Sequence, residues 1–182
     1  MTAKLPSRLH HTAYVSKDLE ATRHFYEDIL GLPLVATWCE QEQLFGKERT
    51  YCHCFFGLGD GSALAFFQFA DPADQALFDP ELPPSPFRHI ALHVDSETQD
   101  SMAERIRAAG YVEPDTFVLE HGYCRSLYIT DPNGMILEFT VDTPGADKIN
   151  EVRRNDAHSE LKRWLGGDHS INNVYRHEDS HA

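Results

Sequence analysis

Three side chains that commonly bind divalent metal ions lie far apart in the sequence, namely His11, His89 and Glu138. Two neutral imidazoles and one carboxylate suit Fe(II), Mn(II), Ni(II) or Zn(II), and they leave positions open for a substrate. Glu138 lies inside the apolar run "MILEFTV", which is typical of a buried strand. A carboxylate is costly there unless it is protonated, paired or bound to a cation. The sequence therefore predicts a metal centre with these three ligands.

A fourth polar group, Gln68, ends the strand-like run "LAFFQF" in the first half of the chain. We take its place to correspond to that of Glu138, which makes its carbonyl oxygen a possible fourth ligand. A single histidine on an apolar strand is more often a hydrogen-bonded core residue, and a single glutamate often faces water. The matched positions of His11 and His89 before matched helices favour the metal.

The two halves of the sequence repeat one pattern, and this pattern places the candidate ligands on strands. Each half begins with a short strand that carries a histidine, 8–15 or 88–94, and continues with an amphipathic helix that ends at Gly31 or Gly110. Three strand-like runs then follow, at 33–38, 49–56 and 62–70 in the first half and at 111–119, 123–130 and 135–141 in the second. The pattern predicts an α+β fold of two βαβββ modules. Alternation along the first strand predicts that His10 points away from His11.

The chain divides into four segments by this pattern. The first module spans 1–70 and the second spans 88–142. The segment 71–87 contains five of the ten prolines, so we expect a crossing linker without regular structure. The tail, 143–182, contains a helical pattern that starts at Asn155 or Asp156.

Composition and charge limit the classes of partner. The net charge of −13 disfavours binding to nucleic acid or to anionic lipid. The sequence shows no secretory signal and no apolar stretch of membrane-spanning length, so a soluble, cytoplasmic protein is expected. The four cysteines, with Cys52 and Cys54 on one side of a strand, are expected to be reduced.

These residues resemble those of the vicinal oxygen chelate superfamily, which includes glyoxalase I, fosfomycin-resistance proteins and type I extradiol dioxygenases. The resemblance covers about residues 8–142 and rests on "LHHTAYVSKDLEATRHFYEDILGL", "FRHIALHV" and "YITDPNGMILEF". It implies paired βαβββ modules with curved sheets around a metal. Carried over by position, the ligands are His11, His89 and Glu138.

The second half is most similar to the extradiol dioxygenases, whose signature is matched by His121, Tyr128, the "DPNG" turn and Glu138. This resemblance implies Fe(II), a catechol-like substrate, O2 and ring cleavage. Tyr128 would hydrogen-bond a substrate oxygen, and His121 would hold an intermediate or move a proton. Leu119 departs from the signature, and "GSALAFFQF" lacks the expected acid/base histidine, for which His53 is a possible substitute.

Other members of the family leave alternatives open. A glyoxalase- or epimerase-type lyase or isomerase would use the same metal, but it usually needs a carboxylate base where Gln68 is expected. A fosfomycin-type thiol transferase would need cations, of which Arg49 and Arg125 are the main candidates. A non-catalytic binding protein would not need the metal set. The resemblance also implies a homodimer.

Overall fold

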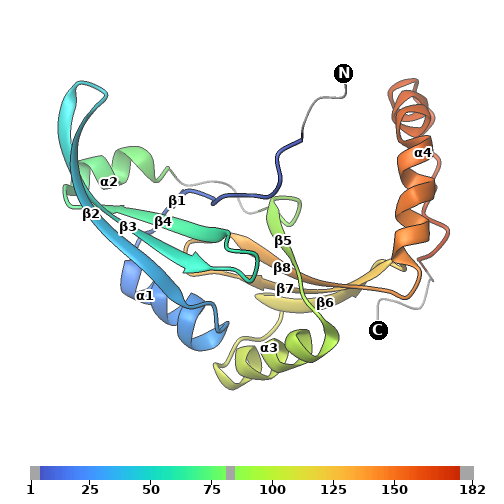
Figure 1. Cartoon of the computed structure of the whole chain (residues 1–182), viewed down its shortest axis with the longest axis horizontal. Coiled ribbons are helices and arrows are strands. Elements are labelled where there is room, and N and C mark those ends of the chain that lie inside the picture. Colours follow the sequence, from blue (N-terminus) through green and yellow to red (C-terminus); the bar gives the residue numbers. More distant parts are fainter. Residues whose placement is uncertain (1–4, 81–84, 177–182) are drawn as a thin grey trace. The chain divides into compact units, whose positions relative to one another are not determined.

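The computed structural model describes residues 5–80 and 85–176, and the chain divides into two units (Figure 1). Unit 1 comprises Met1–Arg88 with Thr130–Met135, and unit 2 comprises His89–Ile129 with Ile136–Ala182. Each unit contains a four-stranded sheet, as the repeat predicts.

Unit 1 contains a mixed sheet in the order β1-β4-β3-β2, in which β1 is parallel to β4 and the other neighbours are antiparallel. His11 precedes β1 and forms an isolated parallel bridge with Ala63. The elements are β1 (Tyr14–Val15), α1 (Leu19–Arg23), the π-helical η1 (His24–Ile29), β2 (Leu34–Leu44), β3 (Lys47–Gly57), β4 (Ala63–Phe69) and α2 (Pro72–Phe78).

Unit 2 repeats this topology, with a sheet in the order β5-β8-β7-β6 and β5 parallel to β8. The elements are β5 (His89–His93), α3 (Ser96–Ala108), β6 (Thr116–Glu120), β7 (Cys124–Thr130), β8 (Ile136–Asp142) and α4 (Ala146–Leu165). The shared order of strands and the helix after each first strand confirm the predicted α+β fold of two βαβββ modules.

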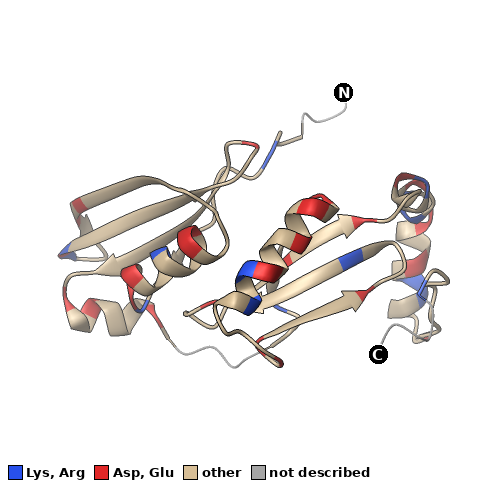
Figure 2. Cartoon of the chain, turned by 90° about the horizontal axis from the view of Figure 1, so that it is seen from below, with Lys and Arg blue, Asp and Glu red and all other residues tan. Residues whose placement is uncertain are grey.

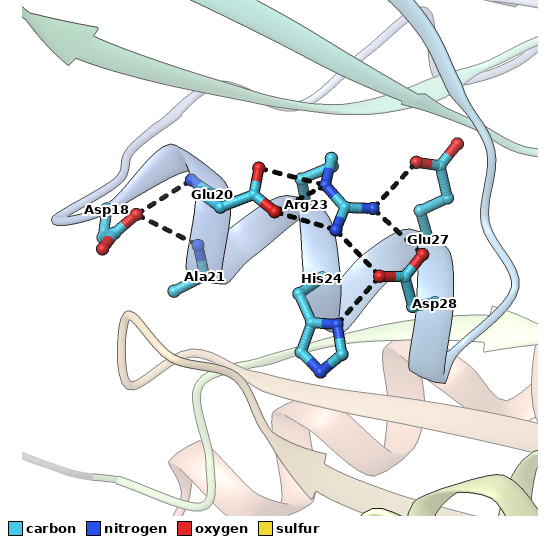
Figure 3. Close-up of polar contacts among 7 residues, drawn as sticks. All are labelled: Asp18, Glu20, Ala21, Arg23, His24, Glu27 and Asp28. Carbon is cyan, nitrogen blue, oxygen red and sulfur yellow. Dashed lines mark hydrogen bonds and ion pairs between the residues drawn. The ribbon is translucent and has the colours of Figure 1, made fainter.

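Helix α1 begins at a side-chain cap and carries an ion-pair network along its surface (Figure 3). The Asp18 carboxylate accepts hydrogen bonds from the backbone N–H groups of Glu20 at 2.8 Å and Ala21 at 3.0 Å. Arg23 then bridges Glu20 and Asp28, each at 2.8 Å. Capping satisfies N–H groups that lack partners within the helix, so the chain leaves the first strand and enters the helix at Asp18.

The π-helical η1, which continues α1, packs on one face of the first sheet through Tyr26, which is fully buried. Its ring lies 5.1 Å from that of Phe56 and 4.9 Å from that of Phe66, measured between ring centroids. Side chains alternate along a strand, so the helix-covered face of β4 carries Leu64, Phe66 and residue 68. The opposite face of β4 carries Ala63 and Ala65.

Unit 2 is arranged in the same way, with α3 covering one face of its sheet. Met102 and Ile106 of the helix are buried, and so are Leu137 and Phe139 of β8. The amide of Gln99 donates to the carbonyl of Phe139 at 2.6 Å, which ties the helix to that strand. Alternation therefore places the residue between Leu137 and Phe139 on the other face.

Two expectations about the connecting segments are wrong. The proline-rich segment contains the helix α2, because Pro72 occupies its first turn, where a missing N–H costs nothing, and Asp71 caps it. The tail helix α4 begins at Ala146, about two and a half turns before Asn155, since no proline or glycine interrupts residues 146–165. Residues 81–84 of the linker and 177–182 of the tail lie outside the described residues.

The sequence has 29 acidic residues against 16 basic ones, and acidic residues occur in both units (Figure 2). Among residues 5–80 and 85–176, none of the helices has the length and apolar character that crossing a membrane requires.

Candidate metal and substrate site

The face of the second sheet that α3 leaves free carries His89 and Glu138. In the parallel register His89 pairs with Ile136 and Ala91 pairs with Glu138, so the two side chains are diagonal neighbours on one face. The imidazole Nε2 of His89 lies 2.9 Å from Oε2 of Glu138. Ligands at adjacent positions around a divalent ion, each about 2.1 Å from it, lie roughly 3 Å apart. The pair thus has the donor types and the spacing of two metal ligands.

Hydroxyl groups surround the Glu138 carboxylate. Thr140 donates to Oε1 at 3.1 Å, and the hydroxyls of Ser126 and Tyr128 also favour the charged form of the carboxylate and so lower its pKa. Burial raises the pKa of Glu138, but these hydroxyl groups and the charge of His89 outweigh it, so the net shift of the pKa is downward. The carboxylate is therefore held in the ionised form that metal binding needs.

Tyr128 and His121 extend this polar group. The Tyr128 hydroxyl lies 3.0 Å from Nε2 of His121, and the Tyr128 ring lies 5.8 Å from that of His89. Burial raises the pKa of Tyr128, as does the neighbouring Glu138, and burial lowers the pKa of His121. Both side chains are thus neutral at neutral pH.

The cleft that holds His11 belongs to unit 1 and has a volume of about 360 Å³. Trp38 of β2 and Phe55 of β3 line it, and the Phe55 ring lies 5.6 Å from the His11 ring. His10 also lines this cleft, with its Nδ1 2.7 Å from Nδ1 of His11. The expectation that His10 points away is wrong, because the chain forms only a single bridge at His11 and does not alternate there as a regular strand does.

The expected correspondence between Gln68 and Glu138 is also wrong. His11 pairs with Ala63 as His89 pairs with Ile136, so Ala65 occupies the place equivalent to Glu138. Gln68 has the opposite parity and lies on the helix-covered face. Its Oε1 accepts from the Leu19 N–H at 3.3 Å. A difference of one residue in register moves a side chain to the other face of a sheet.

His53 adds a further imidazole to unit 1. Its ring stacks on Phe67 with centroids 3.6 Å apart, and it lies 6.2 Å from the His11 ring. The side chain is buried, and its Nε2 has no hydrogen-bond partner among the described residues. Burial, and then His11, lower the pKa of His53, so it is a neutral imidazole with one free nitrogen.

The predicted ligands are divided between the two units. His89 and Glu138 belong to unit 2, together with Tyr128 and His121, whereas His11 belongs to unit 1. Within residues 5–80 and 85–176, no three His, Cys, Asp or Glu side chains are gathered closely enough to enclose a metal ion. The complete set of three therefore stays a prediction.

Sequence reasoning missed several partners of this site. Thr140 and Ser126 follow the same alternation as Glu138 and Tyr128, so the strand pattern contained a signal for them. Asn173 of the tail had no such signal, yet its side-chain amide donates to the carbonyl of His121 at 3.1 Å. The contact joins residues 52 positions apart, which local patterns do not reveal.

Comparisons with known proteins agree with this architecture. The model of the Glyoxalase/Bleomycin resistance protein/Dioxygenase superfamily matches residues 8–139. Proteins named lactoylglutathione lyase from Neisseria meningitidis serogroups A and B are each 26% identical over 143 residues, which cover 78% of this chain and 96% of theirs.

Solved structures show the same fold. The fosfomycin resistance protein FosX from Listeria monocytogenes is 23% identical, with a TM-score of 0.54 over 78% of this chain and 98% of its own. A variant of that protein was crystallised with Mn(II) and 1S,2S-dihydroxypropylphosphonic acid, and it has a TM-score of 0.52 at 23% identity over 79% of this chain and 98% of its own. Because the superfamily model spans most of the chain, including all three predicted ligands, the chain belongs to the Glyoxalase/Bleomycin resistance protein/Dioxygenase superfamily.

Proposed function

We propose that the protein is a metal-dependent enzyme of the glyoxalase type, a lyase or isomerase that acts on a small molecule with two neighbouring oxygens. The observation that carries this proposal is the similarity to the Neisseria lactoylglutathione lyases over 96% of their length. These relatives support the lyase alternative over the ring cleavage of a catechol with O2 that the sequence motif favoured.

His11, His89 and Glu138 are the proposed ligands of one divalent ion. The 2.9 Å separation of the His89 and Glu138 atoms and the ionised state of Glu138 support this role. A bound ion would act as a Lewis acid that polarises a substrate oxygen. Mn(II) occurs in a crystal structure of the Listeria protein, which supports a divalent ion without selecting Fe(II) among the four candidates.

The cleft in unit 1 supports a substrate with an apolar part. Trp38 and Phe55 form aromatic walls beside His11, and a volume of about 360 Å³ suits a small organic molecule. Aromatic walls recognise flat or apolar groups by burial and stacking, and they offer nothing to a phosphonate. The substrate is therefore expected to carry an apolar or aromatic group next to its pair of oxygens.

Proton transfer is assigned to His121 and Tyr128. Glyoxalase-type enzymes resemble this chain in their fold but usually supply a carboxylate base from the first module, where Ala65 lies here. His121 has a lowered pKa, so its neutral imidazole can accept a proton at neutral pH. The raised pKa of Tyr128 keeps its hydroxyl protonated, so it can donate a hydrogen bond to a substrate oxygen.

A ring-cleaving dioxygenase remains the second candidate because of one contact. The 3.0 Å hydrogen bond between His121 and Tyr128 joins the two side chains that the extradiol signature singles out. The same pair would then orient a catechol and an oxygen-derived group in place of moving a substrate proton.

A metal and substrate panel tests both candidates. The apoprotein is loaded anaerobically with Mn(II), Ni(II), Zn(II) or Fe(II), and each form is assayed with a hemithioacetal of methylglyoxal and glutathione and with aryl-substituted hemithioacetals. The same forms are assayed with fosfomycin plus thiol and with catechols plus O2. We expect turnover of a hemithioacetal, faster with an aryl group, and loss of turnover in Glu138→Gln.

Two results would contradict the proposal. Oxygen uptake with a yellow ring-opened product, seen only with Fe(II), would replace it with the dioxygenase. Tight binding of an aromatic ligand without turnover by any metal form would replace it with a binding protein. The expected homodimer stays a prediction, which light scattering during size-exclusion chromatography checks.

A further inference from the structure

Three of the four cysteines are gathered on the first sheet, and none of them is a proposed metal ligand. Cys39 lies on β2, and Cys52 and Cys54 lie on β3. The Sγ atoms of Cys39 and Cys52 are 3.8 Å apart, and those of Cys52 and Cys54 are 3.9 Å apart. All three are free thiols, and they do not meet the geometry of a metal cluster.

The register of the two strands places Cys39 directly opposite Cys52. Opposite residues on antiparallel strands have Cα atoms about 4.5 to 5.5 Å apart, which falls within the range of about 4.4 to 6.8 Å that a disulfide spans. Cys54 is instead opposite Thr37, whose hydroxyl lies 3.6 Å from its sulfur. The backbone therefore favours the pair Cys39–Cys52 among the three possible pairs.

Access to solvent differs along this row of thiols. Cys39 is exposed, Cys52 is half-buried and Cys54 is buried. The strand β2 is the edge of its sheet, so a small reagent can reach Cys39 from outside. Burial, and then the neighbouring cysteines, raise the pKa of Cys52 to about 12, so Cys52 is protonated until it reacts. Cys39 is consequently the thiol that an oxidant meets first.

We infer that Cys39 and Cys52 form a redox-active dithiol that closes reversibly to an intramolecular disulfide when it meets a small disulfide such as oxidised glutathione. The Cys39 thiolate attacks one glutathione sulfur, forms a mixed disulfide and releases one glutathione thiolate. Cys52 then loses its proton and attacks the Cys39 sulfur, which releases the second glutathione. In sum, two protein thiols are oxidised to a disulfide, and oxidised glutathione is reduced to two glutathione molecules.

Tryptic digestion reports this disulfide directly. Trypsin places Cys39 in the peptide 24–47 and Cys52 with Cys54 in the peptide 50–88, whereas Cys124 lies in the peptide 108–125. The folded protein is incubated with oxidised glutathione, alkylated and digested without reductant. We expect peptides 24–47 and 50–88 to be linked, the intact mass to fall by two hydrogen atoms, and dithiothreitol to reverse both changes.

Single variants identify the partners. Cys52→Ala should abolish the linked peptides and leave Cys39 as a glutathione adduct, and Cys39→Ala should abolish both products. Cys54→Ala and the distant Cys124→Ala are matched controls that should still form the link. The inference is overturned if wild-type protein shows no link, if the link survives in Cys52→Ala, if it is lost in Cys54→Ala, or if the disulfide joins two chains.

Circular dichroism of each variant confirms that it is folded. The number of free thiols in wild-type protein should fall by two on oxidation, and this measurement needs no variant.

Discussion

A carboxylate that loses water on burial stays ionised only when other groups replace the hydrogen bonds that water made. At Glu138 the hydroxyl of Thr140 and the Nε2 of His89 do so at 3.1 and 2.9 Å, and the hydroxyls of Ser126 and Tyr128 also help to lower the pKa of the carboxylate. Such a shell prepares the carboxylate for a cation, because the ligand is already oriented and charged. Tyr128 also contacts His121, so its hydroxyl can take part in proton transfer without being a metal ligand.

Replacing Tyr128 separates these two roles. Tyr128→Phe keeps the ring and removes the hydroxyl that contacts His121 and that helps to lower the pKa of Glu138. Loss of a group that takes part in proton transfer commonly lowers rates by about a hundredfold or more, so kcat/KM should fall by about that factor. Affinity for the metal, measured by isothermal titration calorimetry, should change by only about threefold, since hydroxyl partners of a ligand contribute less than the ligand itself.

Tyr123→Phe is the matched control for this variant, because Tyr123 is exposed beside His121. It should leave both kcat/KM and metal affinity unchanged. Equal losses of activity and metal affinity in Tyr128→Phe would show that its hydroxyl acts only by supporting the ligand.

At the scale of elements, the helix α2 is held to the first sheet by a buried ion pair. Asp74 of α2 accepts from Nε of Arg49 on β3 at 3.0 Å and from Nζ of Lys47 at 3.0 Å. The side chains of Asp74 and Arg49 are only 5% and 7% exposed. A buried guanidinium without its carboxylate is costly, so this pair anchors the segment that leads out of the first sheet.

Asp74→Asn should therefore lower the free energy of unfolding by about 3 kcal/mol, measured by urea denaturation. Asp100→Asn is a matched control, since Asp100 pairs with Arg125 at 3.4 Å on the surface, where it is 68% exposed. The control should lose less than about 1 kcal/mol, because exposed ion pairs are screened by water. A loss in Asp74→Asn as small as that of the control would mean that water reaches Arg49.

At the scale of the whole molecule, two units with the same strand order each carry part of the proposed metal site. His11 belongs to unit 1, whereas His89 and Glu138 belong to unit 2. A metal that needs all three ligands therefore makes binding depend on both units. The dithiol of Cys39 and Cys52 lies within unit 1 alone, so its closure should not require metal.

His11→Ala and His89→Ala should each weaken metal binding by about a hundredfold or more, because each removes a ligand. Wild-type protein at a metal concentration of about 100 times Kd should gain about 2.7 kcal/mol of stability, and both variants should lose this gain in thermal unfolding. His24→Ala and His93→Ala are controls with side chains 61% and 72% exposed, and they should bind as wild-type protein does. Unchanged metal affinity in His11→Ala would show that His11 is not a ligand and that the metal is bound by unit 2 alone.

The repeated modules could be predicted because they follow from local periodicity, and so could the residues that share a face with His89 or with Glu138 on the strand of each. A period of two along a strand decides which side chains lie together, and the helices end at Gly31 and Gly110, both with positive φ. These features depend only on residues close in the sequence, so the amino-acid order by itself determined them.

Register between strands was decided by the tertiary structure alone. It placed Gln68 on the helix-covered face, with Ala65 at the expected fourth position, and it set Cys39 opposite Cys52. The tertiary structure also brought Asp74 of α2 to Arg49 of β3, where the two form an ion pair. Pairing between strands depends on hydrogen bonds and packing between distant segments, and no pattern within one segment specifies its alignment with another.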